Sequence, residues 1–314
     1  MPPLRAGRCV VAALAGSLVA APPAGAHVHT NFNLIPRHGA LLGAFVNTRS
    51  DMWAGVQGLQ QTLGFKLTIV HHYKPWRITS YKVDRTAMRH RQIPMISWSP
   101  GGTTTAAAIA SGSQDALIKR TAHDIKSLRK RIFLRLAYEM DQPPGHRRYI
   151  GQPAEFIRAW RRVYRIFQRV GAVNARFVWC AIAANFKTGH AQAYYPGNRY
   201  VNWIAADGYN WYPAKSEWAG YRKIFTPFYR WATGHRRPLM IAETGSMEDP
   251  HRAGRKARWI RSSRRWVRAH HHIRAVVYFD SISPKGYDFR LGTSSSALHA
   301  FLRWGRGTYW NMMR

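Results

Sequence analysis

The sequence contains almost no cysteine. Of its 314 residues only Cys9 and Cys180 carry a thiol. Cys9 has no lipobox before it and lies in a segment that we expect to be removed, so no disulfide is available and stability has to come from packing. Cys180 lies in the apolar run 177–182. There a buried, inert thiol is favoured over a catalytic nucleophile.

The sequence also lacks an apolar stretch long enough for a transmembrane helix. The run 9–21 is too short to span a bilayer. It follows Arg5 and Arg8 and precedes the small residues 24–26, so residues 1–26 are predicted to be a secretory signal peptide, with an uncleaved membrane anchor as the alternative. We therefore expect a secreted or cell-wall-associated protein whose folded domain covers residues 27–314.

Acidic residues are scarce: 14 Asp and Glu stand against 48 Lys and Arg, which gives a formal net charge of +34. The bases are dispersed over predicted helices, and no helix-turn-helix, zinc-finger or RNP motif occurs, so no specific nucleic-acid partner is expected. An exported chain of this charge would suit an anionic cell-wall polymer as a partner. The alternative is that the basic residues are ordinary surface residues of an enzyme and have no binding role. The oligomeric state is left open.

Motifs for metal binding and serine catalysis are absent. The sequence has no HExxH, CxxC or GxSxG pattern. His270, His271 and His272 precede the last predicted strand, at its N-terminal end, and His71 and His72 would alternate between the two faces of a strand. We therefore expect no metal and no cofactor.

Short apolar runs alternate with helical patterns along the chain. The runs are continuous, as in parallel strands that are buried on both faces, and they cover 40–46, 67–70, 93–98, 132–136, 177–182, 201–206, 239–242 and 275–279. The clearest helix begins at Pro153 and stops at Gly171. Residues 103–113 are expected to form a loop. Eight such units predict a single closed (β/α)8 TIM barrel of the α/β class, with an open doubly wound sheet as the alternative.

Four of the acids directly follow apolar runs: Glu139, Asp207, Glu243 and Asp280. In a β/α barrel these positions open onto the C-terminal face, where the chemistry is done. Glu139 follows the fourth run and Glu243 the seventh, so the two can face each other. Such a pair suits retaining glycoside hydrolysis, in which one carboxyl protonates the leaving oxygen and the other attacks the anomeric carbon. The alternative is a structural Glu–Arg ion pair at each strand end.

Around these carboxylates the sequence resembles glycoside hydrolase family 26, whose best-known members are β-mannanases. The stretch 135–140 (RLAYEM) is similar to the family's R-x-x-H-E-M motif. The similarity is recognisable over about residues 130–301, and the segments that carry it are Trp160, 171–174, 178–179, Asn185, 195–201, 207–210, 238–246, 278–280, Asp288 and Arg290.

The resemblance implies a (β/α)8 fold of the retaining clan with Glu139 as acid/base and Glu243 as nucleophile. Tyr209 would hydrogen-bond the nucleophile and orient it. The chain departs from the family pattern at several sites, namely Tyr138 in place of His, Asp141-Gln142 in place of Asn-Gly, Asn198 and Asn202 in place of Asp, and Tyr278 in place of a frequent Trp. These departures leave the catalytic pair in place but change several groups that shape the sugar site.

Sugar binding is expected from aromatic platforms and polar groups near strand ends. The residues predicted to bind substrate are His72, Trp76, Trp98, Arg135, Tyr138, Asn185, Asp207, Asn210, Trp211, Tyr278 and Asp280. For any single aromatic residue, packing in the barrel mouth is an equal alternative. Trp160, Trp259 and Trp266 lie on helix stripes and are expected in the core.

Two functions remain open on these observations. The first is an exported retaining glycosidase that acts on a β-linked, mannan-like polysaccharide through its two glutamates. The second is a weakly catalytic or non-catalytic glycan-binding barrel that its charge holds at the anionic cell wall.

Overall fold

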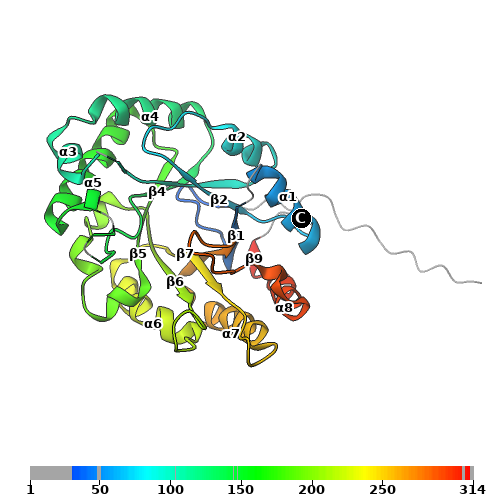
Figure 1. Ribbon diagram of the computed structural model, residues 1–314. Helices are drawn as coiled ribbons and strands as arrows, with labels where there is room; N and C mark the ends of the chain where they lie inside the picture. Colours follow the sequence, from blue (N-terminus) through cyan, green and yellow to red (C-terminus); the bar gives the residue numbers. More distant parts are fainter. Residues whose placement is uncertain are drawn as a thin grey trace, which may run out of the picture.

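A computed structural model describes residues 30–47, 51–102, 104–143, 145–146, 148–305 and 308–311. The predicted signal peptide, residues 1–26, lies outside the described residues. Parallel strands form a closed barrel, since β1 pairs with both β2 and β8, and helices surround it (Figure 1). The barrel strands are β1 (Ala40–Val46), β2 (Ile69–Lys74), β3 (Ile93–Trp98), β4 (Ile132–Leu136), β5 (Ala175–Ile182), β6 (Trp203–Asn210), β7 (Leu239–Ser246) and β8 (Ile273–Asp280). The prediction of a closed barrel is confirmed, and the open sheet is excluded.

The helices follow the strands in alternation. The α-helices are α1 (Met52–Leu63), α2 (Lys82–Arg89), α3 (Ala106–Ser111), α4 (Asp115–Ser127), α5 (Pro153–Val170), α6 (Tyr221–Ala232), α7 (Arg255–Ala269) and α8 (Ser295–Gly305). Short 3-10 helices are η1 (Arg148–Ile150), η2 (Ala183–Lys187), η3 (Gln192–Tyr194), η4 (Asn198–Tyr200), η5 (Thr233–His235) and η6 (Leu291–Thr293), and a short strand β9 (Trp310–Asn311) pairs with β1. Among the described residues, no helix has the length and apolar character that crossing a membrane requires.

Helix ends follow local sequence signals. α5 begins at Pro153 and ends at Gly171, whose φ of 75° suits glycine, as predicted. The expected loop 103–113 is wrong in part, because Ala106–Ser111 form α3. Thr105 caps that helix by accepting the N–H of Ala108, a signal that the run of small residues concealed.

The core has two layers that fix which way each strand residue points. Inside the barrel, Met95, Phe133 and Trp203 pack together. Their neighbours Ile96 and Leu134 belong to the larger layer between strands and helices. Because successive side chains of a strand alternate, this register decides which polar residues enter the barrel. Trp160, Trp259 and Trp266 are buried in the outer layer, as expected.

Candidate active site

Arg135 is the charged centre of the barrel interior. It follows the inward-facing Phe133 by two positions on β4, so its side chain also points inward, where it is fully buried. Its guanidinium donates to Glu243 and Asp207, and its Nη1 also donates to the Ser97 hydroxyl at 3.1 Å. A buried guanidinium needs such carboxylate partners, because an unpaired charge in this environment is strongly destabilising.

A β-bulge aims Glu243 into the barrel. On β7, Ile241 packs against the helices and Ala242 packs inside, so a regular strand would turn Glu243 outward. The register shifts at this point, since Ala206 of β6 pairs with Ile241 but the next residue, Asp207, pairs with Glu243. The extra residue turns the carboxylate inward, which is how bulges re-aim side chains beside active sites.

Glu243 is held as an anion. Tyr209 donates its hydroxyl to Oε2 at 2.5 Å, and Tyr73 donates its hydroxyl to Oε1. Burial alone would raise the pKa of Glu243, but the Arg135 charge and the two tyrosine hydrogen bonds lower that pKa to about 2. Glu243 is therefore ionised at any ordinary pH.

Glu139 lies on a strained turn just after β4. Its φ is 50° and that of Ala137 is 41°, in a backbone region that residues other than glycine rarely adopt. The Glu139 N–H donates to the Cys180 carbonyl at 2.8 Å, and Gln142 Nε2 donates to Glu139 Oε2 at 2.6 Å. The turn thus brings a half-buried carboxylate over the end of the barrel.

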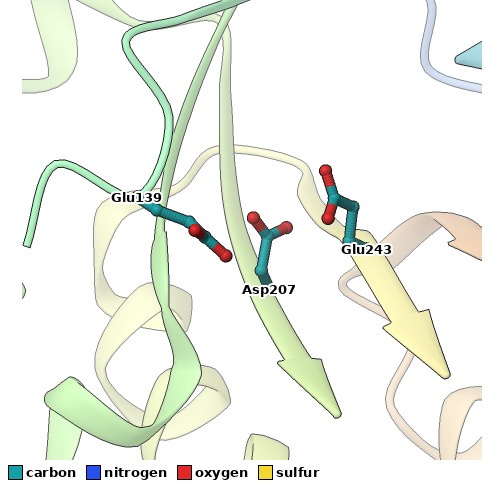
Figure 2. Close-up of side chains that lie close together, drawn as sticks. All are labelled: Glu139, Asp207 and Glu243. Atoms are coloured by element: carbon teal, nitrogen blue, oxygen red, sulfur yellow. The ribbon is translucent and has the colours of Figure 1, made fainter. Parts of the chain in front are cut away.

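Glu139, Asp207 and Glu243 converge. One carboxylate oxygen from each lies within 4.8 Å of the others. Figure 2 shows the three side chains, from the end of β4, from β6 and from β7, turned toward one shared space. Three carboxylates so placed could take a cation, and in the structure the guanidinium of Arg135 already bridges two of them, Asp207 and Glu243.

Asp207 differs from Glu243 although both contact Arg135. Burial, reinforced by the nearby charges of Glu243 and Glu139, raises the pKa of Asp207 well above its usual value despite the guanidinium. The Cys180 thiol lies 3.2 Å from Asp207 Oδ1, and burial raises the pKa of that thiol too. The two carboxylates that share the Arg135 guanidinium therefore have pKa values pushed apart, and Glu243 is the more readily ionised of the two.

Two further residues predicted to bind substrate lie at this end of the barrel. Tyr138 has its ring 4.4 Å from the Arg135 guanidinium and also contacts the Tyr73 ring. Trp211 is partly exposed and packs on Tyr209 and Phe289. Both are placed where a sugar chain could contact them.

Trp76, Trp98 and His72 do not lie where sugar binding requires. Trp98 alternates with the inward-facing Ser97, so it points to the helices, where it is fully buried and stacks on Trp76 at 4.1 Å. His72 likewise faces outward and lies 3.0 Å from buried Asp84 of α2. The expectation that these three side chains bind substrate therefore does not match their positions. Trp98 and His72 follow the outward register of their strands, and Trp76, in the connection after β2, is buried against Trp98.

Asn185, Asn210, Tyr278 and Asp280 use their polar groups on the protein itself. Asn185 donates to the carbonyl and carboxylate of Asp141, and Asn210 donates to Ser246 Oγ at 2.8 Å. The Tyr278 hydroxyl donates to the Phe289 carbonyl, and Asp280 accepts the Leu291 N–H. These hydrogen bonds fasten the connections around the site, and substrate binding by the four residues stays a prediction.

Sequence reasoning missed the direct roles of Tyr73, His71 and Gln142. His71 faces inward, with Nε2 2.7 Å from Ser97 Oγ, and burial lowers its pKa well below the usual value. Tyr73 follows in the same register and reaches Glu243. No sequence signal separates the two faces of 69–74; the inward face is set by the structure, in which buried Ile69 packs in the barrel interior.

Known proteins share the fold and part of the sequence. No protein-family model matches the chain. Endoglucanase H of Acetivibrio thermocellus is 31% identical over 277 residues, which are 84% of this chain and 30% of that protein. Beta-1,3-xylanase of an Alcaligenes species is 26% identical over 140 residues, 43% of this chain and 27% of that protein. The chain thus spans less than a third of the length of these curated relatives.

Solved structures show the fold over nearly the whole chain. A GH26 β-mannanase from Bacteroides ovatus matches with a TM-score of 0.66 at 12% identity, covering 89% of this chain and 92% of that one. The GH26 domain of an endo-β-mannanase/endo-β-glucanase from Prevotella bryantii matches with a TM-score of 0.61 at 12% identity and the same coverage. The resemblance to glycoside hydrolase family 26 that the motifs indicated is therefore confirmed in the fold.

Proposed function

We propose that this chain, whose fold and motif order resemble glycoside hydrolase family 26, is an exported retaining glycoside hydrolase that cleaves a β-linked polysaccharide. The observation that carries the proposal is the convergence of Glu139 and Glu243, with carboxylate oxygens within 4.8 Å. Retaining enzymes hold their two carboxyl groups about 5–5.5 Å apart, whereas inverting enzymes leave about 6.5–9.5 Å for a water molecule. Export rests on the pattern of residues 1–26.

The reaction proceeds in two displacements. Glu243 attacks the anomeric carbon while Glu139 transfers its proton to the leaving glycosidic oxygen, which gives a glycosyl ester on Glu243. Glu139, now a carboxylate, removes a proton from water as that water attacks the same carbon and releases Glu243. The pKa of about 2 keeps Glu243 ready to attack. Tyr209 and Tyr73 fix the orientation of its carboxylate.

A β-1,4-mannan is the first substrate to test. The matching structures include proteins named as β-mannanases, and a relative in sequence is named endoglucanase H. A β-1,4-glucan is therefore the second substrate. Tyr138 and Trp211, the predicted sugar-binding residues that lie at the site, are the groups expected to decide between the two.

A hydrolysis screen on β-mannan, β-glucan and β-xylan tests the proposal. The wild type should release reducing ends from at least one glycan, and Glu243→Ala should lower turnover by at least about 10⁴-fold. Proton NMR of the fresh product should show the β-anomer first. Glu217→Ala, at an exposed carboxylate paired with Lys223, is the matched control. Initial release of the α-anomer, or near-normal turnover by Glu243→Ala, would overturn the proposal.

A further inference from the structure

A pocket of about 880 Å³ lies at the end of the barrel opposite the three carboxylates. Its walls come from the segments that enter the strands: residues 30–37 before β1, 233–238 before β7 and 271–274 before β8. The pocket therefore belongs to the amino ends of the strands, whereas Glu139 and Glu243 lie toward their carboxyl ends.

The walls of this pocket are strongly basic. The titratable residues that line it are Arg37, Arg236, Arg237, His271, His272 and Arg274. Among the described lining residues none is Asp or Glu, and apolar surface comes from Ile35, Pro36 and Pro238. Four arginines without a carboxylate among the described lining residues produce a local positive potential that attracts anions.

One wall is a fixed part of the fold. The segment 30–36 closes the barrel at the amino end of the strands, where Leu34 is buried against the interior core. The Trp203 indole donates to the Asn33 carbonyl at 2.7 Å, and Arg176 donates to the Asn33 side chain at 3.0 Å. Arg274 donates to the Pro36 carbonyl. The pocket is therefore preorganised and would not pay to order a loop on binding.

Guanidinium donors at the pocket exceed the acceptors that they bond among the described residues. Arg237 donates through Nη2 to the Asn198 carbonyl at 2.6 Å. The Nε atoms of Arg237 and Arg274 are buried with no hydrogen-bond partner among the described residues. Arg37 and Arg236 are exposed. Guanidinium groups bind carboxylate and phosphate through two parallel hydrogen bonds, so this excess suits an anionic ligand.

We propose that this pocket binds an acidic polysaccharide, one that bears carboxylate or phosphate groups. The volume exceeds what a single oxyanion needs, and the apolar residues can pack on the C–H faces of sugar rings. The described lining residues include no Phe, Tyr or Trp, the platforms on which single-stranded nucleic acids stack their bases. Bound there, the polymer leaves the opposite end free, so one molecule can be anchored to an anionic matrix while its carboxylates face another glycan.

Calorimetry with short oligosaccharides tests this site directly. The probes are an oligogalacturonate, a phosphomannan oligosaccharide of equal charge, a neutral manno-oligosaccharide and a short DNA duplex. The variant is Arg37→Glu with Arg236→Glu, and the control is Arg158→Glu with Arg265→Glu, which makes the same change in net charge on exposed positions of α5 and α7. Thermal unfolding confirms that both are folded.

The wild type should bind one of the two acidic oligosaccharides, and which one it binds identifies the anionic group. The pocket variant should weaken that binding about tenfold or more, and the control by less than about threefold, since dispersed exposed charges contribute little. Equal losses in the two variants would mean a general positive field and would overturn the site. Absence of binding, or tighter binding of the DNA duplex lost in the same variant, would also overturn the proposal.

Discussion

The two ends of the barrel have opposite charge chemistry. Every acidic residue except Asp124 lies at the carboxyl end of the strands or in the first turn of a following helix, the full set being Asp51, Asp84, Asp115, Glu139, Asp141, Glu155, Asp207, Glu217, Glu243, Glu248, Asp249, Asp280 and Asp288. The amino end holds the basic pocket, whose described lining has no carboxylate. A net charge of +34 therefore does not mean a uniform surface.

Topology explains much of this separation. In a β/α barrel all helix N-termini lie at the same end as the strand C-termini, and helix N-termini favour acidic residues. Asp51 caps α1, and Asp115 and Glu155 lie in the first turns of α4 and α5. Helix C-termini favour basic residues, and Arg169 and Arg268 lie in the last turns of α5 and α7. The few acids therefore lie at the end where they stabilise helix N-termini and form the site. Arginines predominate at the other end.

Changing one end of the barrel and measuring the properties of both tests whether the two ends act independently. Glu139→Ala should lower turnover of a polysaccharide by about 10²–10⁴-fold, because it removes the general acid. The loss should shrink on an aryl glycoside, whose leaving group needs no proton. Binding of the acidic oligosaccharide should not change. Arg37→Glu with Arg236→Glu should show the reverse pattern, and a loss of both properties in either variant would show that the two ends are one site.

Arg135→Met tests how far the carboxyl end depends on its single buried cation. The substitution leaves Asp207 and Glu243 buried without a counter-charge, so the free energy of unfolding should fall by about 3–5 kcal/mol. Arg265→Met on α7 removes an exposed guanidinium and should change it by less than about 0.5 kcal/mol. Urea unfolding measures both. An equally small loss of unfolding free energy in both variants would contradict this expectation. It would mean that Asp207 and Glu243 become protonated with little loss of stability when Arg135 is removed.

Alternating apolar runs and helices predicted the barrel from the sequence, because eight strand–helix units have few other ways to pack. The strand ends were less clear. β6 and β7 continue through Asp207 and Glu243 to Asn210 and Ser246, since polar residues can extend a strand that an apolar run begins. The sequence still indicates the carboxylates, because scarce acids directly after apolar runs are hard to explain by solubility.

Side-chain direction could not be predicted in the same way. A strand buried on both faces shows no polar alternation. An error of one residue in the assumed register therefore assigns a side chain to the helix layer when it belongs in the barrel interior, or the reverse. His72, which the sequence predicts to bind substrate, faces outward, whereas His71 faces the barrel interior, and Trp98 and Tyr278 also point to the helices. The bulge that turns Glu243 inward has no signature in the sequence. Only the resemblance to a known family pointed to that glutamate as the nucleophile.

Two tyrosines offer a smaller and more specific test of the anion at the carboxyl end. Tyr73→Phe and Tyr209→Phe each remove a hydrogen bond to Glu243, a loss of about 1.5–3 kcal/mol or about 10–100-fold in kcat/KM. Since these bonds help to lower the pKa of Glu243 to about 2, removing one raises that pKa. Activity needs the ionised form and is lost as pH falls through the pKa, so the acid limb should move to higher pH.

The pH profile of kcat/KM from acid to neutral pH checks this direction. Tyr164→Phe, on α5 against Phe177 of the outer layer, is the control and should leave the acid limb in place. A fall in kcat/KM with an unmoved acid limb would mean that the tyrosines position the sugar and do not tune the carboxylate.

The smallest expected effect concerns Cys180, the thiol nearest the carboxylates. Its Sγ lies 3.2 Å from Asp207, but burial raises the pKa of the thiol, so it is protonated and not a nucleophile. Cys180→Ala should keep turnover within about threefold and cost about 1 kcal/mol of stability, the usual size for a small buried change. Steady-state kinetics and thermal unfolding measure the two. A loss of turnover beyond tenfold without unfolding would contradict this expectation. It would mean that the Cys180 thiol positions Asp207 for catalysis, because Sγ is the atom that the substitution removes and it contacts that carboxylate.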